Sequence, residues 1–368
     1  MFFIKNFNYL FFLFIFLFSC DTDNNNDDIF GDGYDRQSIL INWADNIITP
    51  AYENFNISLS ALSQSVELFI SNPNESSLIQ LSNDWLSSYM KWQYIEMFDF
   101  GYAETINYKN KMNIYPADSD FINSNISSEI SDLNNNSYND ARGFPALDYM
   151  LHGLADDASS IVSLYQNDER YSNYLVAIID NMIYNTNLVV DAWSDSKNDF
   201  IDSNGNTATS SLNIMTNDFI FFYEKGLRAN KIGIPAGVFS SYPIPSSVEA
   251  FYKKDVSKQL ALEALQACED FFIGKHIDSE LSGPSFSSYL DYLPSSSDTD
   301  LVDDIISQFS ESRAQINLLD NNFFDQIESN NMEMLDAYEA IQLLVVYFKV
   351  DMLQLLAVSV DYVDADGD

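Results

Sequence analysis

The chain contains few of the residues that carry metal chemistry and nucleophilic catalysis. Only two of its 368 residues are histidines, His152 and His276, and only two are cysteines. The zinc-protease pattern HExxH therefore cannot be written. The residues three positions before the histidines, Tyr149 and Ile273, also exclude the Glu-x-x-His pairs of di-iron bundles. Cysteine-ligated zinc, a disulfide framework, a GxSxG elbow and a phosphate-binding loop are excluded as well.

Basic residues are also scarce. The sequence holds 17 Lys and Arg against 55 Asp and Glu, a formal net charge of -38, so a polyanion such as DNA or RNA is repelled. We therefore exclude nucleic acid as a partner. A negative surface attracts cations, but it also keeps an aromatic-rich protein soluble, and both interpretations stay open. With 46% hydrophobic and 15% aromatic residues, the chain has ample material for ordered cores.

The N-terminus begins with a short apolar segment that ends in cysteine. In MFFIKNFNYLFFLFIFLFSC, Lys5 precedes an apolar run over residues 9–18, which is too short to span a bilayer as a helix. We predict a cleaved signal peptide over residues 1–20. Its ending, LFSC, resembles a bacterial lipobox, in which Cys20 becomes the lipidated first residue and holds the protein to a membrane surface.

Residues 21–33 are acidic and polar, and we predict a tether there. Such an acidic run resembles the export signal of surface-exposed lipoproteins in some Gram-negative bacteria. A plain solvated linker is the alternative. The chain is thus expected in the bacterial cell envelope, at the outer membrane, on either its periplasmic face or the cell surface.

The remaining sequence has a helical period. Apolar residues fall on one helix face in steps of three and four, at Phe55, Leu59, Leu62, Val66 and Phe69, and again along residues 334–355. Pro50 lies inside the first pattern and predicts a kink or restart. We find no sustained strand alternation, so the fold class is all-α. Further helices are expected over residues 75–99, 117–134, 168–198, 211–230, 247–272 and 301–318.

Polar and proline-rich stretches divide this pattern. The segment NDFIDSNGNTATSS predicts a linker at residues 201–211 between an N-terminal helical bundle, residues 34–200, and a C-terminal bundle, residues 212–368. Residues 231–247, KIGIPAGVFSSYPIPSS, predict an ordered irregular connection. It is either a wall of a pocket or a surface crossover.

Several segments in order resemble the imelysin family. The central one is GFPALDYMLHG, residues 143–153, which is similar to the family pattern Gly-x-His-x-x-Glu followed by a short apolar run and a glycine. WQYIEMFDFGYAE, MNIYPADSDFI and NIITPAYENF resemble family segments upstream. KIGIPAG, VEAFYKKDVSKQLALEALQACEDFFIG and FKVDMLQLLAVSVDYVDADGD follow the family plan downstream. The resemblance covers the chain from about residue 34 to its end.

This resemblance implies two helical bundles packed side by side, as if by an ancient duplication, with a cleft lined by the central motif. In the family the motif histidine and glutamate are the presumed metal ligands. Here Pro145 and Asp148 stand at those positions, as in a divergent branch of the family. The local sequence also explains the motif without a metal, because Gly143 permits a turn and Pro145 suits the first turn of a helix.

Other residues join the candidate site. His152 follows Asp148 by four residues, so the two share a helix face and are candidate ligands of one ion, or His152 caps the helix end. We expect Arg142 to pair with Asp148 or with an anionic ligand. The carboxylates Glu96, Asp99 and Glu249 lie in segments that match the family, and we place them near the cleft.

Two classes of function follow from the resemblance, and a scaffold without chemistry is a third option. One is a lipid-anchored envelope protein that binds iron, another divalent cation or a small ligand for uptake, together with proteins of an uptake system. The alternatives are a metallopeptidase, after the family's peptidase name, and a surface scaffold without chemistry. The loss of the motif histidine to Pro145 favours binding over catalysis, because a metallopeptidase needs a metal-activated water.

Overall fold

Helices account for the regular structure in the part of the chain that the computed structural model describes, residues 32–294 and 300–360. Strands are absent from these ranges, apart from an isolated bridge between Lys275 and Ser282. The predicted signal peptide, Cys20 and most of the predicted tether lie outside the described residues. None of the described helices is long and apolar enough to cross a membrane. The all-α prediction is therefore confirmed.

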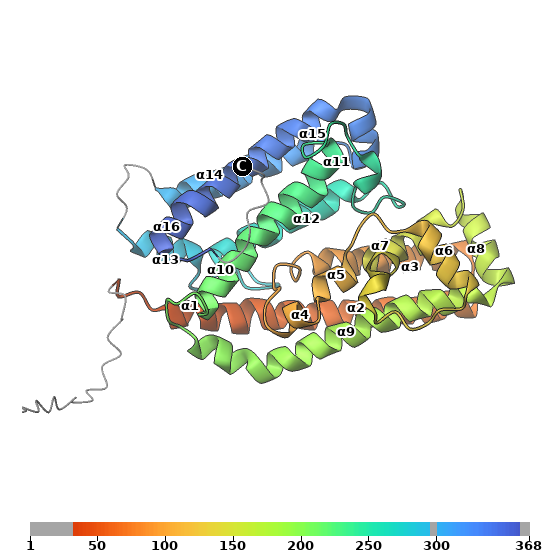
Figure 1. The fold of residues 1–368 in the computed structure, drawn as a ribbon, viewed down its shortest axis with the longest axis horizontal. Coiled ribbons are helices and arrows are strands. Elements are labelled where there is room, and N and C mark those ends of the chain that lie inside the picture. The colour runs from red at the N-terminus through yellow and green to blue at the C-terminus, as the bar shows by residue number, and fades with distance from the viewer. Residues whose placement is uncertain (1–31, 295–299, 361–368) are drawn as a thin grey trace, which may run out of the picture. The chain divides into compact units, whose positions relative to one another are not determined.

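From Tyr34 onward the chain forms one unit of packed helices, in which two groups of helices follow one another along the chain (Figure 1). The first group comprises α1 (Arg36–Asn42), η1 (Trp43–Ile48), α2 (Thr49–Ser71), α3 (Glu75–Trp92), α4 (Tyr102–Thr105), α5 (Tyr108–Met112), α6 (Ser119–Ser127), η2 (Asn136–Ala141), α7 (Gly143–Asp148), η3 (Tyr149–Gly153), α8 (Ala158–Asn167) and α9 (Glu169–Asp202). The long helix α2 packs against both α3 and α9, and the short elements cover them.

The second group comprises α10 (Ser211–Phe221), η4 (Phe222–Gly233), α11 (Ile234–Ala236), η5 (Pro245–Ser247), α12 (Ser257–Ile273), α13 (Phe286–Tyr292), α14 (Leu301–Leu318), α15 (Phe323–Val346), η6 (Tyr347–Met352) and α16 (Leu353–Leu356). Here α14 packs on α15 and α12, and η4 packs on α15. The connection 203–210 between α9 and α10 falls within the predicted linker.

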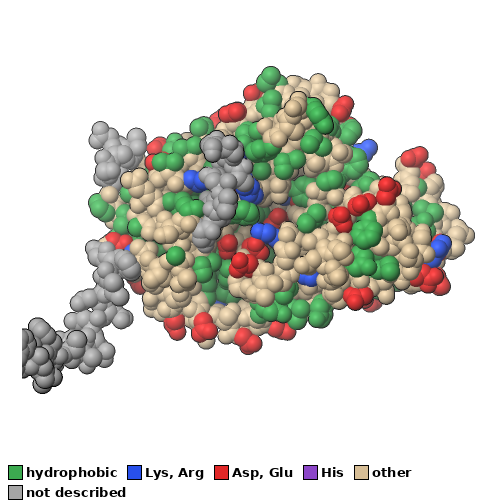
Figure 2. Space-filling model, viewed as in Figure 1, with side chains coloured by type: hydrophobic (Ala, Val, Ile, Leu, Met, Phe, Trp, Pro, Cys, Tyr) green, Lys and Arg blue, Asp and Glu red, His purple; other side chains and the backbone are tan. Residues whose placement is uncertain are grey.

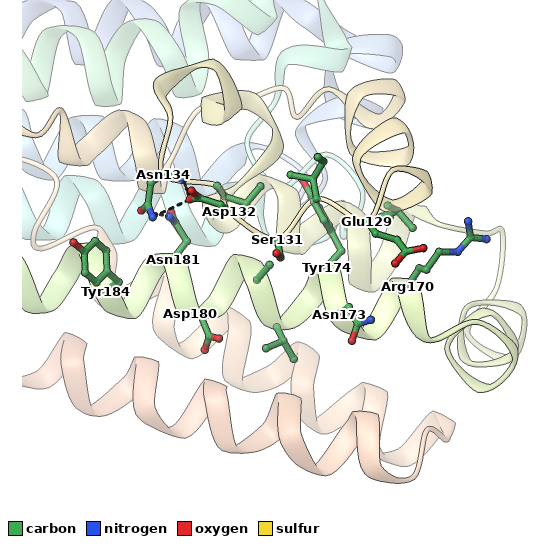
Figure 3. Close-up of a pocket in the computed structure, with 15 residues that line it drawn as sticks. Glu129, Ser131, Asp132, Asn134, Arg170, Asn173, Tyr174, Asp180, Asn181 and Tyr184 are labelled. Atoms are coloured by element: carbon green, nitrogen blue, oxygen red, sulfur yellow. Dashed lines mark hydrogen bonds between the residues drawn. The ribbon is translucent and has the colours of Figure 1, made fainter.

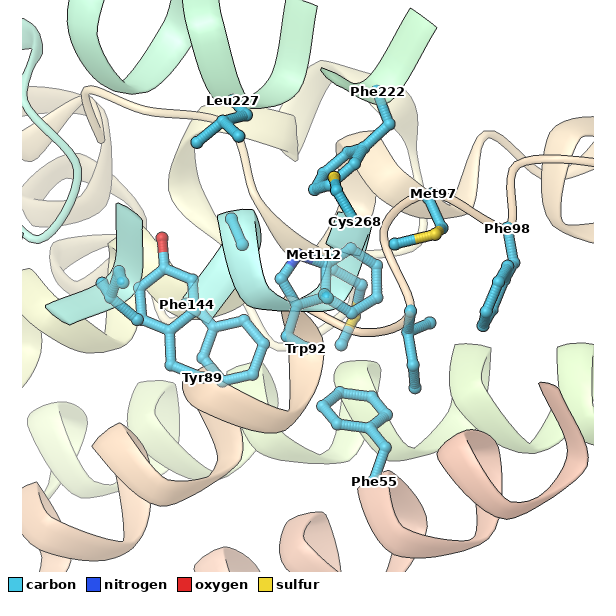
Figure 4. Packing of buried hydrophobic residues seen from close by; sticks show 14 of the residues in the cluster. Phe55, Tyr89, Trp92, Met97, Phe98, Met112, Phe144, Phe222, Leu227 and Cys268 are labelled. Carbon is cyan, nitrogen blue, oxygen red and sulfur yellow. The ribbon is translucent and has the colours of Figure 1, made fainter. Parts of the chain in front are cut away.

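The predicted apolar stripes form the core. Phe55, Leu59 and Phe69 of α2 are completely buried, and so are Phe348 and Met352 of the last long segment. One cluster of buried hydrophobic residues runs through both groups. Figure 4 shows side chains of the first group, among them Trp92 and Phe144, near Phe222 and Cys268 of the second. The two groups therefore share a core, and their division into two domains stays a prediction.

Some predicted boundaries differ from the structure. The helix expected over 117–134 ends at Ser127, and that expected over 247–272 begins only at Ser257. The connection expected to be irregular is partly helical, because η4 continues to Gly233 and α11 follows it directly. The spacing of apolar residues predicted these helices. The turns that interrupt them lie within apolar stretches, and no pattern in the sequence marks where they occur.

Pro50 has a consequence for how the two groups meet. It lies in the first turn of α2, directly after the π-helical turn η1, as the predicted restart requires. Because proline has no N–H, the carbonyl of Asn46 four residues earlier lacks its helical donor. The Asn46 carbonyl accepts a hydrogen bond from the N–H of Ile277, at 3.0 Å, in the second group. Nearby, the buried Asn42 amide donates to the carbonyls of Gly274 and Pro284, at 3.2 and 3.0 Å.

Candidate functional site

The motif helix α7 is buried along its whole length and begins at a glycine that no other residue can replace without strain. Gly143 has φ of +72°, and a Cβ at this position would lie 2.2 Å from the carbonyl oxygen of Met112. Pro145 follows in the first turn, as the sequence predicted, and is buried. After Asp148 the helix continues as the π-helical turn η3, which carries His152. The motif is therefore a tight joint against α5.

Asp148 binds backbone of the second group. Its carboxylate accepts hydrogen bonds from the N–H of Tyr252 at 2.8 Å and from the N–H of Lys253 at 2.9 Å. One of its oxygens also lies 2.9 Å from Nδ1 of His152. The side chain is 2% exposed, so it is shielded from water. Charge-assisted hydrogen bonds of this kind are about twice as strong as neutral ones, so Asp148 is a firm link between the two groups.

His152 is held at both nitrogens. Its Nδ1 faces Asp148, its Nε2 lies 2.7 Å from the hydroxyl of Ser82, and its ring packs against the edge of Trp85 at 5.2 Å. The structure thus brings Asp148 and His152 together as their spacing predicted.

These residues do not fit a metal ion. Pro145 offers no ligand atom, and protein groups occupy both oxygens of Asp148 and both nitrogens of His152. Within residues 32–294 and 300–360, no group of three or more His, Cys, Asp and Glu side chains is placed to hold a metal ion.

Arg142 does not contact Asp148, so that expected ion pair is wrong. The guanidinium is completely buried and donates to the carbonyl of Leu133 and to the side-chain oxygen of Asn139. Burial lowers the pKa of the Arg142 guanidinium to about 10. Arg142 therefore ties the segment before α7 to the preceding loop, and the sequence could not show this because its partners are uncharged.

A cavity of about 440 Å³ lies between the two groups of helices. Its walls come from the segment after α3, from α5 and the residues after it, and from α10, η4, the start of α11 and the end of η5. It is lined by Glu96, Asp99, Lys109, Asn110, Asn113, Ile114, Tyr115, Asp218, Phe221, Phe222, Lys225, Gly226, Asn230, Ile234 and Ser247. Ile234 and Ser247 belong to the segment 231–247, which therefore contributes a pocket wall.

A buried polar network forms one side of this cavity. The Asn113 amide donates to Glu96 and to Glu249, each at 3.1 Å, and accepts from the Tyr89 hydroxyl at 2.5 Å. Glu249 also forms a buried ion pair with Lys231 at 2.5 Å. Burial raises the pKa of the Glu96 carboxyl, and the nearby Glu249 adds to this, although Lys231 opposes it. Glu96 is therefore a carboxyl whose charge is costly to maintain.

An ion pair lies at another wall of the cavity. Asp99 binds Lys109 at 2.5 Å, and the Lys109 ammonium also lies 4.7 Å from the centre of the Phe221 ring. Burial raises the pKa of Asp99, and the hydrogen bond from Lys109 opposes this rise. The cavity thus combines carboxylates, ammonium groups, amides and aromatic rings, a set that can bind a small polar molecule by hydrogen bonds and charge.

The sequence predicted part of this site. Glu96 and Asp99 line the cavity. Glu249 does not line it but accepts a hydrogen bond from the lining residue Asn113, so the structure brings these three carboxylates together. The motif residues Arg142, Gly143, Pro145 and Asp148 do not line it. Sequence reasoning missed the residues of α5, α10 and η4, because single polar residues in helices have no pattern that marks a cavity.

A second cavity, of about 520 Å³, lies on the first group alone, between residues 126–134 and α9. Figure 3 shows Asn134 beside Asp132 and Asn181, with hydrogen bonds to both, and Tyr184 at one end of the cavity. None of the predicted site residues lines it. We therefore place the candidate functional site in the cavity between the two groups.

The first prediction concerns Gly143. Gly143→Ala should lower the free energy of unfolding by about 2–4 kcal/mol, because it adds positive-φ strain and a collision with the Met112 carbonyl. Urea unfolding measures the change. The matched control is Gly205→Ala, where a Cβ would meet nothing within 4 Å. Equal stability of the two variants would show that the joint between α5 and α7 is looser than described.

The second prediction concerns the pH dependence of stability. Because the folded pKa of Glu96 is raised, its charged form costs stability above that pKa, and the cost vanishes below the ordinary value of 4.5. Glu96→Gln should therefore be more stable than the wild type by about 1 kcal/mol at pH 7, and the difference should shrink as the pH falls toward 4.5. Urea unfolding between pH 4 and 8 checks this, with the exposed Glu67→Gln as control. A Glu96→Gln variant that is less stable at pH 7 would refute the interpretation.

Comparison with known proteins agrees with the fold. The imelysin family model, Peptidase_M75, matches residues 48–346. Among solved structures, one described as an iron-regulated protein A precursor from Parabacteroides distasonis ATCC 8503 has a TM-score of 0.71 at 16% identity, over 87% of this chain and 95% of that one.

An imelysin-like protein from Psychrobacter arcticum 273-4 has a TM-score of 0.70 at 16% identity, over 89% of this chain and 97% of that one. At this identity the two structures show the fold alone. Among curated proteins, none matches this chain. Because the family model covers most of the sequence, this chain belongs to the imelysin family.

Proposed function

We propose that this chain is a lipid-anchored protein of the bacterial cell envelope that binds a small iron-bearing ligand for uptake. The observation that carries the proposal is the cavity of about 440 Å³ whose walls come from both groups of helices. Small molecules bind preferentially in concave sites of this size, at boundaries between packed units. One structural neighbour is described as an iron-regulated protein, which supports iron as the cargo.

The groups around the cavity favour an oxygen-rich iron chelate over a bare ion. In the described ranges no cluster of three or more acidic, histidine or cysteine side chains could hold a metal ion, so the chelator has to supply most of the ligands of the iron. Lys109, Lys225 and Asn230 line the cavity and can donate to the carboxylate or hydroxyl oxygens of a chelator. Glu96 and Asp99 can accept from its hydroxyl groups. Figure 2 shows that acidic side chains outnumber basic ones on the displayed face.

The lipid anchor supports this role. Acyl chains on Cys20 would hold the binding site near the membrane, at about 0.8 kcal/mol for each buried methylene, with residues 21–33 as a tether. There the protein would pass its ligand to proteins of an uptake system, at the periplasmic face or at the cell surface.

The alternative of a metallopeptidase is less well supported. It requires a metal-activated water, and the residues at the motif do not fit a metal ion. The alternative of a surface scaffold gives no role to the cavity, because a scaffold binds no ligand there.

The test uses the full protein purified in detergent, titrated calorimetrically with ferric citrate and separately with citrate alone. We expect ferric citrate to bind with a micromolar dissociation constant and citrate alone at least 10-fold more weakly. Asn230→Trp, which fills the cavity from an exposed position, should weaken binding at least 10-fold. Asn198→Trp, at an exposed position of α9, is the matched control and should bind as the wild type does.

Three outcomes contradict parts of the proposal. Failure of ferric citrate to bind, or equal binding to both tryptophan variants, would remove the ligand-binding function and leave the scaffold. Casein hydrolysis that a chelator abolishes would favour the metallopeptidase. Retention of a Cys20→Ala variant in the membrane fraction would exclude the lipid anchor.

A further inference from the structure

A chain of hydrogen bonds joins Ser82, His152 and Asp148, which come from α3, η3 and α7. The Ser82 hydroxyl lies 2.7 Å from Nε2 of His152, and Nδ1 of His152 lies 2.9 Å from the Asp148 carboxylate. Such an order of a hydroxyl, an imidazole and a carboxylate is the constellation of the serine hydrolases, which recurs on unrelated folds and is recognised by geometry rather than by position in the sequence. None of the three residues lines the cavity between the two groups of helices.

The surroundings of Asp148 determine where the protons lie. Its two oxygens accept hydrogen bonds from the N–H groups of Tyr252 and Lys253, so the carboxylate acts as an acceptor throughout. In the neutral imidazole, His152 then carries its proton on Nδ1 and donates it to Asp148. This leaves a lone pair on Nε2, and the Ser82 hydroxyl has to donate to it. The serine proton is therefore directed at a base, as general-base catalysis requires.

The Ser82 hydroxyl also differs from those of three other helical serines in this chain. Ser60, Ser127 and Ser196 each donate to the carbonyl four residues earlier in their helix. The hydrogen bond of Ser82 goes instead to the imidazole. Trp85 packs edge-on against that ring at 5.2 Å, and the histidine side chain is only 14% exposed, so the imidazole is fixed in position.

Ser82 and His152 line a cavity of about 310 Å³. Most of its remaining wall is apolar, including Leu78, Leu151 and Ile161. Lys253 and Asn83 also line it and are donors for a negatively charged oxygen. Asp156 and Asp157 lie at the same cavity and disfavour an anionic substrate. The cavity therefore suits a neutral ester with a short apolar acyl group.

We propose that Ser82, His152 and Asp148 form an esterase site that transfers the acyl group of such an ester to water. Ser82 Oγ bonds to the carbonyl carbon while its proton passes to Nε2 of His152. The ester C–O bond then breaks, and the alcohol leaves with that proton. Water adds to the acyl-serine and gives a proton to His152, which returns it to Ser82 as the acid leaves. Asp148 orients the imidazole and stabilises its cation.

The rate of ester hydrolysis depends on how well the donors near Ser82 stabilise the negatively charged oxygen. Lys253 and Asn83 are side chains, and Lys253 also binds Asp255 at 2.7 Å. Losing one donor of a built oxyanion hole costs about 10²- to 10³-fold in rate. We therefore expect a slow turnover of the ester but full reaction with an agent that needs only an activated serine.

The experiment uses the full protein in detergent with diisopropyl fluorophosphate and, separately, with p-nitrophenyl butyrate. Fluorophosphate labelling followed by peptide mapping should place the added mass on Ser82. Ser82→Ala should lose the label and lower butyrate hydrolysis at least 100-fold. Ser87→Ala, at an exposed position of the same helix, is the matched control and should keep both.

A second variant tests the acyl cavity without changing the three residues. Ala158→Trp, at an exposed lining position, should lower kcat/KM for p-nitrophenyl butyrate at least 10-fold and that for the acetate ester less, with Ser82 still labelled. The proposal is overturned if Ser82 stays unlabelled under conditions that label chymotrypsin completely. It is equally overturned if Ser82→Ala hydrolyses the butyrate ester at the wild-type rate.

Discussion

The carboxylate of Asp148 holds a turn of the second group of helices against the motif helix of the first. The N–H groups of Tyr252 and Lys253 in this turn donate hydrogen bonds to Asp148. The turn also contains two residues other than glycine at positive φ, Ala250 at 57° and Lys254 at 70°. Each such residue costs about 1–3 kcal/mol. A hydrogen bond to a charged group contributes about 1.5–3 kcal/mol, so two of them offset the strain.

The functional surfaces follow from this link. Glu249 directly precedes the turn, so the position of the turn places its carboxylate against Asn113 and Lys231, next to the cleft. The Asp148 carboxylate also accepts from Nδ1 of a neutral His152, which leaves Nε2 to accept from the Ser82 hydroxyl. The cavity between the two groups of helices and the proposed esterase site are therefore separate, but both depend on the buried Asp148 carboxylate. A carboxylate that the family motif would suggest as a metal ligand acts here as an acceptor for backbone.

Much of the fold could be predicted from the sequence, because an apolar period of three and four residues is a direct consequence of helix geometry. The stripe from Phe55 to Phe69 and the restart at Pro50 are visible without a structure. The pairing of Asp148 with His152 was equally accessible, since residues four apart on a helix share a face. Glu96 and Asp99 came from the family resemblance, and both line the cleft.

What the sequence could not show are contacts between distant residues of common types. Tyr252 and Lys253 offer only their backbone, which every residue has, and they lie more than 100 positions from Asp148. Ser82 is one serine among many, 70 positions from His152. The role of Arg142 was predicted wrongly for the same reason, because its partners are a carbonyl and an amide rather than a charge.

The most direct test of the role of Asp148 is hydrogen exchange at the backbone amides of Tyr252 and Lys253 in the wild type and in Asp148→Asn. Asparagine keeps the shape of the side chain but replaces one acceptor with a donor. We expect both amides to exchange faster in the variant and the free energy of unfolding to fall by about 2–4 kcal/mol. Unchanged exchange at both amides, with wild-type stability, would contradict the claim that Asp148 holds the turn that carries Tyr252 and Lys253.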